Sequence, residues 1–283
     1  MLFVSDLDRT LIYSRKFILD PLSGEKFNVR LIETKAGEEI SFMLESSINK
    51  LRELSRSLSF VPVTTRTLEQ YQRIHIFQNE IIPPFAIVSN GGNILINNEI
   101  DKEWNNIIRS KVLLQCLPLR AVLEEFDKVM CGDWVISKRH ADDLFLYFII
   151  DQNAIPFDEL NYFELWLKAN GWAMSLQGRK LYFVPNCITK WNAIFYIKEL
   201  ACAGKTCAAG DSLLDLCMLE MADFAIAPRH GEVARILEAG NNTEGKIHIT
   251  KSSGIHAADE ILDYVREYMT YSSYTEGFTV RRI

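Results

Sequence analysis

Two aspartates near the amino terminus, Asp6 and Asp8, are the residues best suited to chemistry. They follow the short apolar run Leu2 to Val4, which is too short for a helix and fits a buried strand. In extended backbone, side chains two residues apart leave the same face, so both carboxylates are expected to point into one space. Such a pair suits either Mg²⁺ binding or a division into nucleophile and general acid. The segment also suits a plain turn or helix cap, and by itself it leaves these alternatives open.

Three other groups of polar residues stand at predicted strand ends or helix starts. Thr64 begins a Thr-Thr-Arg-Thr cluster at residues 64–67, which suits either anion binding at a helix start or an ordinary N-cap. Lys190 precedes a predicted helix, where most lysines are simply solvated. Asp211 and Asp215 lie in a Gly-Asp-Ser-Leu-Leu-Asp loop, where the first also suits an N-cap and the second an exposed helical position.

Alternating strands and helices are predicted to position these groups. The predicted strands are 2–4, 60–63, 85–88, 206–209 and 224–227, and the predicted helices are 44–58, 68–77, 191–200, a segment through 218–221, and 257–269. This alternation predicts a parallel sheet with right-handed crossovers, in which ligands bind beyond the carboxyl ends of the strands. Turn signals at 21–24 and 35–38 predict one or two hairpins within residues 13–43, forming a flap beside that edge.

The middle of the chain shows a different pattern. Helical spacing from Ile107 to Val129 is followed by strand-like runs at 134–137 and 144–150, then by a helix at 157–169 and strands at 172–176 and 180–184. The order α-β-β-α-β-β with hairpin turns predicts an antiparallel sheet with helices on one side. We therefore expect residues 101–184 to form a domain inserted between two parts of the core, 1–100 and 185–283.

Bulk composition excludes several classes of protein. The chain has 283 residues and a net charge of −6, which disfavours a sequence-independent nucleic-acid binder. No apolar stretch is long enough to span a bilayer, and the early aspartates interrupt any signal-peptide core. The six cysteines form no Cys-x-x-Cys pair, so they predict core residues in a reducing compartment rather than a zinc site. A cytoplasmic location follows as an expectation, and the oligomeric state is left open.

In this order, the motifs resemble those of the haloacid dehalogenase-like phosphatase superfamily. The resemblance covers the whole chain: Asp-Leu-Asp-Arg-Thr at 6–10 looks like the first motif, Thr64 the second, Lys190 the third and the 210–215 loop the fourth. The inserted α-β-β-α-β-β segment is similar to the larger cap of the Cof-type and sucrose-phosphatase-like branch, and Asn-Gly-Gly at 90–92 matches the turn before that cap. The fold class it implies is α/β, a Rossmann-like parallel core with helices on both faces and an inserted α+β cap.

The resemblance also implies a role for each residue. Asp6 would be the nucleophile that forms an aspartyl-phosphate, and Asp8 would be the general acid and base. Mg²⁺ would be held by Asp6, the Asp8 backbone carbonyl and Asp211, and Asp215 would brace the site. The other implied residues are the substrate-binding Thr64, Lys190, Asn90, Arg66 and Arg179, and the supporting Ser212 and Thr10.

These roles predict a Mg²⁺-dependent phosphatase that acts on a small phosphorylated metabolite, with a sugar phosphate favoured. Asp8 disfavours a dehalogenase, which has no leaving oxygen to protonate. A sugar phosphomutase and a non-catalytic phospho-ligand sensor are the alternatives. The sensor is motivated by departures from the family pattern: Arg9 where glycine is common, Leu214 where asparagine is common, and a long 14–43 segment. Neither nucleic acid nor a membrane is expected as a partner.

Overall fold

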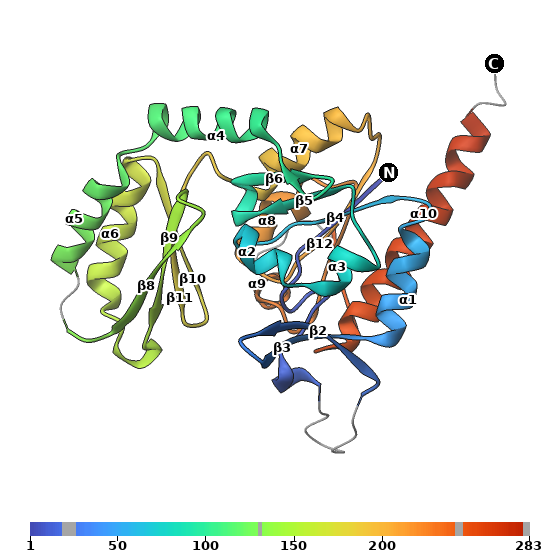
Figure 1. Cartoon of the computed structure of the whole chain (residues 1–283), viewed down its shortest axis with the longest axis horizontal. Helices are drawn as coiled ribbons and strands as arrows, with labels where there is room; N and C mark the ends of the chain where they lie inside the picture. Colours follow the sequence, from blue (N-terminus) through green and yellow to red (C-terminus); the bar gives the residue numbers. More distant parts are fainter. Residues whose placement is uncertain (19–26, 130–131, 241–245, 280–283) are drawn as a thin grey trace.

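The computed structural model describes residues 1–18, 27–129, 132–240 and 246–279, and Figure 1 shows that they form two bodies. The larger body, on the right of Figure 1, contains both ends of the chain. The smaller body, on the left, is built from the middle of the sequence. Among the described residues, no helix combines the length and apolar character needed to cross a membrane.

A five-stranded parallel sheet forms the centre of the larger body, in the strand order β14, β13, β12, β1, β4. The strands are β1 (Leu2–Ser5), β4 (Ser59–Pro62), β12 (Thr206–Ala209), β13 (Phe224–Ala227) and β14 (Ile247–Ile249). Every residue of the neighbouring strands β1 and β12 is buried, because a parallel sheet is covered on both faces. The predicted parallel core is confirmed, although β14 was not among the predicted strands.

Two hydrophobic clusters show that helices cover both faces of this sheet. Leu2 and Val4 face a cluster that includes Ile194 of α7, whereas Phe3 faces a cluster that includes Ile48 of α1. The helices of the larger body are α1 (Glu45–Leu54), α2 (Leu68–Gln72), α3 (His75–Asn79), α7 (Lys190–Leu200), α8 (Leu216–Leu219), α9 (Glu232–Glu238) and α10 (His256–Thr279). Short 3₁₀ turns occur at Arg15–Phe17, Ser89–Gly91 and Leu213–Asp215, with another at Gln152–Ala154 in the smaller body.

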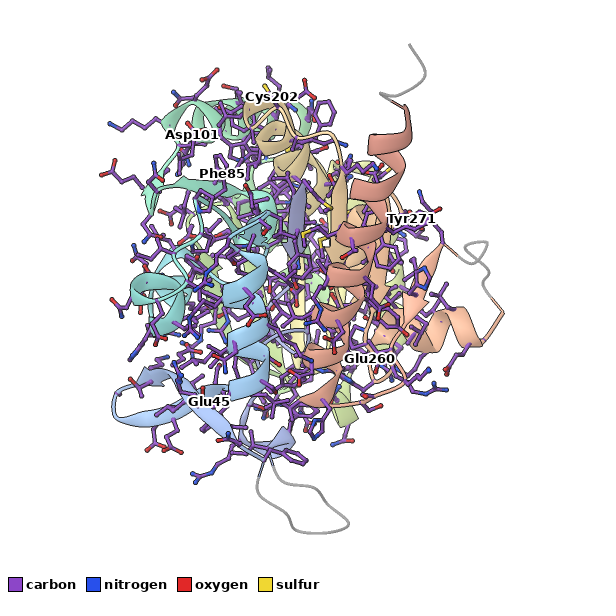
Figure 2. The ribbon with its side chains drawn as sticks, turned by 90° about the vertical axis from the view of Figure 1, so that its right-hand side faces the viewer. Glu45, Phe85, Asp101, Cys202, Glu260 and Tyr271 are labelled. Carbon is purple, nitrogen blue, oxygen red and sulfur yellow. The ribbon has the colours of Figure 1, made fainter. Side chains whose placement is uncertain are left out.

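Helices α1 and α10 run side by side on one surface, as Figure 2 shows in blue and red. The Lys50 ammonium lies 2.7 Å from the Asp263 carboxylate across this contact. The predicted helices 44–58 and 257–269 are thus both present, the first ending earlier and the second extending further than its apolar spacing indicated.

The predicted hairpin before α1 is also present. Strands β2 (Val29–Lys35) and β3 (Glu38–Leu44) pair antiparallel around a turn at Ala36 and Gly37, both with positive φ. The other turn signal, at residues 21–24, lies outside the described residues. The hairpin sits at the lower edge of the larger body in Figure 1.

Two predictions about helices were wrong, and one strand pairing was not predicted. The predicted strand 85–88 is present as β5 (Phe85–Val88), which adjoins the central sheet through a parallel bridge between Val63 and Ile87. The sequence did not indicate that β5 also pairs antiparallel with β6 (Asn93–Ile96), which pairs with β7 (Glu99–Ile100). The predicted helix 68–77 is divided, because Ile74 adopts extended backbone between α2 and α3. The predicted helix 107–129 is divided into α4 (Lys102–Gln115) and α5 (Leu119–Val129), because Pro118 disfavours helical backbone in the residue before it.

The smaller body has the predicted order of elements. Its antiparallel sheet has the order β10, β11, β9, β8, with α5 and α6 packed together on one side (Figure 1). The bounds are β8 (Val135–Ala141), β9 (Phe145–Ile150), α6 (Phe157–Ala169), β10 (Trp172–Gln177) and β11 (Lys180–Pro185). Phe126 of α5 packs against three buried rings, Phe148 and Phe163 in tilted contacts and Phe183 edge-on, which makes the interior aromatic. The exact limits of the inserted domain, 101–184, stay a prediction.

Candidate active site

The carboxyl ends of β1 and β12 bring Asp6 and Asp211 together. The two strands are neighbours in register, Ser5 opposite Ala209, and the Asp6 N–H donates to the Ala209 carbonyl at 2.8 Å. Each strand is followed within two residues by an aspartate. Asp6 and Asp211, which are 205 positions apart in the chain, therefore meet at one edge because the sheet is parallel.

Asp6, Asp211 and Asp215 form a buried cluster in which each offers one carboxylate oxygen within 4.8 Å of the others. Burial, together with the mutual repulsion of the carboxylates, raises the pKa of Asp6 well above its ordinary value and that of Asp211 to about 7. Charged groups arranged in this way need positive charge close by.

Lys190, the first residue of α7, supplies one positive charge. Its ammonium lies 2.6 Å from both the Asp6 and the Asp215 carboxylates and 3.2 Å from the Val63 carbonyl, and its side chain is only 1% exposed. Burial alone would lower the pKa of Lys190, but Asp215 and Asp6 raise it, so the ammonium is charged. One ammonium cannot balance three carboxylates, and an all-oxygen donor set with excess negative charge fits a hard divalent cation such as Mg²⁺.

The 210–215 loop determines how Asp215 is oriented. The Ser212 N–H and hydroxyl donate to Asp215 Oδ2 at 2.9 and 2.8 Å, which leaves Oδ1 for Lys190. A Cβ at Gly210 would lie 2.4 Å from the Asp215 Cβ, so only glycine allows this close approach. The supporting role expected of Ser212 stays a prediction.

Asp8 lies outside the three-carboxylate cluster. Arg66 binds it in a bidentate manner, with Nε 2.7 Å from Oδ2 and Nη2 2.8 Å from Oδ1. Burial acts to raise the pKa of Asp8, but the Arg66 guanidinium outweighs it and holds that pKa below its ordinary value. Asp8 is nevertheless influenced by the same groups as the cluster, because Lys190 helps to lower its pKa and Asp8 helps to raise that of Asp211. The chain turns just after Asp8, where the Leu7 carbonyl accepts three backbone N–H groups and Arg9 has a φ of 65°. That Asp6 and Asp8 point into one space stays a prediction.

Arg9 lies on the other side of the cluster. Its Nε is 3.4 Å from Asp211 Oδ2, and its Nη2 donates to the His230 carbonyl at 3.1 Å. The side chain is 44% exposed. The arginine that replaces glycine in the first motif therefore stands at the solvent side of the acidic cluster and contributes a second, partly solvated positive charge.

Comparisons with known proteins were made by sequence and by structure. No protein-family profile matches the chain, and no curated protein matches it by sequence. Among solved structures, the sucrose-phosphatase from Synechocystis, determined with sucrose and phosphate, superposes with a TM-score of 0.69 at 15% identity, covering 95% of this chain and 97% of that one. This chain has the haloacid dehalogenase-like fold.

Two further structures with this fold also superpose over almost their full lengths. A HAD/Cof-like hydrolase from Plasmodium vivax gives a TM-score of 0.58 at 10% identity, covering 94% of this chain and 95% of that one. A sugar phosphatase of HAD subclass IIB gives 0.54 at 14% identity, covering 94% of this chain and 98% of that one. The smaller body of this chain is accordingly the cap of the fold, and we use that name below.

The remaining predicted residues of the haloacid dehalogenase-like site fall into two groups. Thr64, Thr10 and Asn90 are buried beside it: Thr10 Oγ1 lies 3.5 Å from Asp6 Oδ2, and Thr64 Oγ1 accepts the Arg66 N–H at 3.1 Å. Within the described part of the chain, no donor reaches Asn90 Oδ1, although Nδ2 lies 3.4 Å from the Ile188 carbonyl. Arg179 is exposed in the β10–β11 turn, and the structure does not bring its side chain to the cluster.

Sequence reasoning missed residues on both the cap and the core. On the cap, the Tyr182 hydroxyl and the Asp8 carboxylate both raise the pKa of the Lys180 ammonium, which lies 5.7 Å from the centre of the Tyr147 ring. Strand alternation places Lys180 and Tyr182 on one face, a signal that the sequence offered. In the core, the buried Glu33 contacts Arg66, and no sequence signal marked it because a single glutamate in a polar hairpin has no diagnostic spacing.

Proposed function

We propose that this protein is a Mg²⁺-dependent phosphatase that hydrolyses a small phosphorylated metabolite, most suitably a sugar phosphate. The observation that carries the proposal is the buried Asp6 carboxylate, held at 2.6 Å by Lys190, with Asp211 and Asp215 close enough to share a cation. A structural ion pair would not require three buried carboxylates around one ammonium, because excess buried charge is destabilising.

Asp6 is the nucleophile in this proposal. One of its oxygens attacks phosphorus, the bond to the leaving oxygen breaks, and an aspartyl-phosphate forms. Lys190, bonded to Asp6 Oδ1, orients this carboxylate, while Thr64 and the backbone N–H groups after Asp6 bind phosphoryl oxygens. A divalent cation held by Asp6 and Asp211 would offset the repulsion between the anionic nucleophile and the anionic phosphoryl group.

Asp8 transfers protons in both halves of the reaction. It gives a proton to the leaving oxygen, and it then takes one from the water that attacks phosphorus and breaks the bond to Asp6. A positioned acid and base contributes about 10²–10⁴-fold. Asp8 must hold a proton before it can donate one, and its ion pair with Arg66 opposes this. We therefore expect the Nε and Nη2 edge of Arg66 to exchange Asp8 for the anionic substrate as its partner when the substrate binds.

The cap provides the basis for proposing a small, polyhydroxylated substrate. Lys180, Tyr182 and Tyr147 lie on one face of the cap sheet, with the Lys180 ammonium influenced by Asp8 of the core. Aromatic rings and an ammonium suit a sugar ring with hydroxyl groups. The structurally similar sucrose-phosphatase and sugar phosphatase act on substrates of this kind, as their names state.

Phosphate release from a panel of sugar phosphates, nucleotides and a generic aryl phosphate tests the proposal. We expect Mg²⁺-dependent release of inorganic phosphate. Asp6→Asn should abolish this release for every substrate, and added metal should not restore it. Asp158→Asn, which removes one exposed cap carboxylate, is the matched control and should turn over normally. Isomerised sugar phosphate without phosphate release would indicate a mutase, and no turnover across the panel, with ligand binding retained, would indicate a sensor.

A further inference from the structure

Glu33 is a buried charge that the proposed mechanism does not use. It lies on β2 and is fully inaccessible to solvent. Its Oε2 accepts Arg66 Nη1 at 2.7 Å and the Ser41 hydroxyl at 2.7 Å, and its Oε1 lies 3.3 Å from Arg73 Nε. A carboxylate withdrawn from water in this way is tolerated only when every oxygen is paired, and here both are.

The backbone of β2 is distorted so that Glu33 can point inward. The register of the β2–β3 pair shifts on both sides of Glu33, and Glu33 forms an isolated bridge with Ile74. Ile32 and Glu33 are consecutive and both buried, so β2 is covered on both faces at this point. A β-bulge re-aims a side chain in this manner, often beside an active site.

Arg66 is held by two separate edges. The Nη1 end contacts Glu33, whereas Nε and Nη2 face the Asp8 carboxylate, with Nη2 also 3.1 Å from Ser41 Oγ. The guanidinium is planar and rigid, so fixing one edge fixes the direction of the other. The Arg66 side chain is 11% exposed, whereas that of Asp8 is 50% exposed. The Nη1 end at Glu33 therefore lies in the interior, and the Nε and Nη2 edge at Asp8 lies toward the solvent.

We propose that Glu33 is a positioning residue. By binding the Nη1 end of Arg66, Glu33 keeps the Nε and Nη2 edge of Arg66 aligned with Asp8, and with the substrate phosphoryl group that replaces Asp8 as the partner of Arg66. The β2–β3 hairpin is then part of the active-site architecture. This inference rests on the proposed function for the role of Asp8, but the position of Arg66 can be tested without turnover.

The competing explanation is that Glu33 only stabilises the hairpin. The chain offers a matched control for this, because Arg30 of the same strand is bound in a bidentate manner by Glu45, at 2.8 and 2.7 Å, with no link to Arg66. Figure 2 labels Glu45 at the start of α1, next to the hairpin. Glu45→Gln therefore weakens the anchoring of the hairpin and leaves Arg66 untouched.

Kinetics of Glu33→Gln, Arg66→Gln and the double variant form the first test. We expect Glu33→Gln to lower kcat for an aryl phosphate by about 10- to 100-fold with a smaller change in KM, since small displacements of reacting groups cost this much. Glu33→Gln should add almost nothing in the Arg66→Gln background, because it acts through Arg66. Full additivity, or an equal loss of kcat in Glu45→Gln, would overturn the proposal.

The Nε–Hε resonance of Arg66 in ¹⁵N NMR spectra provides the second test, and it does not depend on activity. We expect a resolved, slowly exchanging signal in the unmodified protein and in Glu45→Gln, and its loss in Glu33→Gln. Persistence of the signal in Glu33→Gln would refute the positioning role. Should Glu33→Gln not fold, Ser41→Ala weakens the same network and should reduce both kcat and protection in the same direction. An unmodified protein that keeps the protected signal but hydrolyses no phosphate ester would contradict the proposed function alone.

Discussion

The core and the cap differ in what they bury. Among the described residues, every buried charged side chain belongs to the core: Asp6, Glu33, Lys190, Asp211 and Asp215. The interior of the cap is apolar and aromatic, centred on Phe126 and three other phenylalanine rings. Buried charges need partners from several strands, which an open parallel sheet supplies at one edge, whereas a small antiparallel sheet needs only packing to be stable. This difference between the two regions indicates that the core carries the chemistry and that the cap encloses the site.

The largest effect should come from removing the buried ammonium of Lys190 in the core. Lys190→Met leaves Asp6 and Asp215 without their shared ammonium, so we expect a loss of about 3–5 kcal/mol in the free energy of unfolding of the metal-free protein and no phosphatase activity. Urea denaturation and phosphate release measure both. Lys198→Met, on the same helix but 4.0 Å from a partly exposed Asp223, should change stability by less than about 0.5 kcal/mol. Equal effects of the two variants would remove the contrast between core and surface.

Metal and pH should act on the same carboxylates. The pKa of Asp211 is raised to about 7 by burial and by Asp215, whereas an unfolded aspartate titrates near about 3.9. Between these values the folded state binds a proton that the unfolded state has lost, so the stability of the metal-free protein should fall as the pH rises from about 4 to 7.

Mg²⁺ should reverse this loss, because it competes with the proton for the same oxygens. At 100 times its dissociation constant it should add about 2.7 kcal/mol. Thermal unfolding with Mg²⁺ and with a chelator, at pH 5 and pH 8, should show the larger gain at pH 8. Asp211→Asn should abolish the gain at both values, and an equal gain at both in the unmodified protein would place the metal elsewhere.

Contacts between cap and core should have a smaller effect. Asp142, in the β8–β9 turn of the cap, accepts hydrogen bonds from the Ser89 hydroxyl, from Asn93 Nδ2 at 3.2 Å and from the Leu68 N–H at 3.0 Å. Asp142→Ala should cost about 1–3 kcal/mol of stability or of closed-cap population and raise KM up to about tenfold.

Asp143→Ala is the control for this variant. Asp142 and Asp143 both have positive φ, so alanine introduces the same kind of backbone strain at either position. Kinetics, and limited proteolysis at the two segments that flank the predicted inserted domain, 92–101 and 184–188, measure the difference. Indistinguishable KM values would mean that Asp142 does not hold the cap closed.

The smallest effect should be that of the cap ammonium. Lys180→Gln should lower kcat/KM by no more than about fivefold, in keeping with the energies of solvent-accessible charge pairs of up to about 1 kcal/mol. Arg179→Gln is the comparison, since the family resemblance implies a substrate-binding role for Arg179, whereas its neighbour Lys180 is the residue influenced by Asp8. A larger loss in Arg179→Gln would restore the original prediction.

Local patterns predicted much of this fold because the information they need is local. The apolar run after Met1, the helical spacing in α1 and α6, and the order of elements in the cap were all readable from neighbouring residues. The errors were local as well: Pro118 divides one predicted helix, and the 89–91 turn, with positive φ at Ser89 and Asn90, reverses the chain so that β6 pairs antiparallel with β5.

The order of the four motifs along the chain, and the family resemblance that it carries, selected Asp6, Lys190, Asp211 and Asp215, because each residue taken alone left an ordinary alternative open. Their partners could not be read in this way. Lys190 and Asp6 are 184 residues apart, and the packing of α7 against the β1 face of the sheet is what brings them within 2.6 Å. The turn of Asp8 toward Arg66 and the inward bulge at Glu33 depend on contacts between segments that have no common sequence pattern. Charge pairing over such separations is decided by packing, since the Coulomb energy of a pair depends on distance and burial rather than on position in the chain.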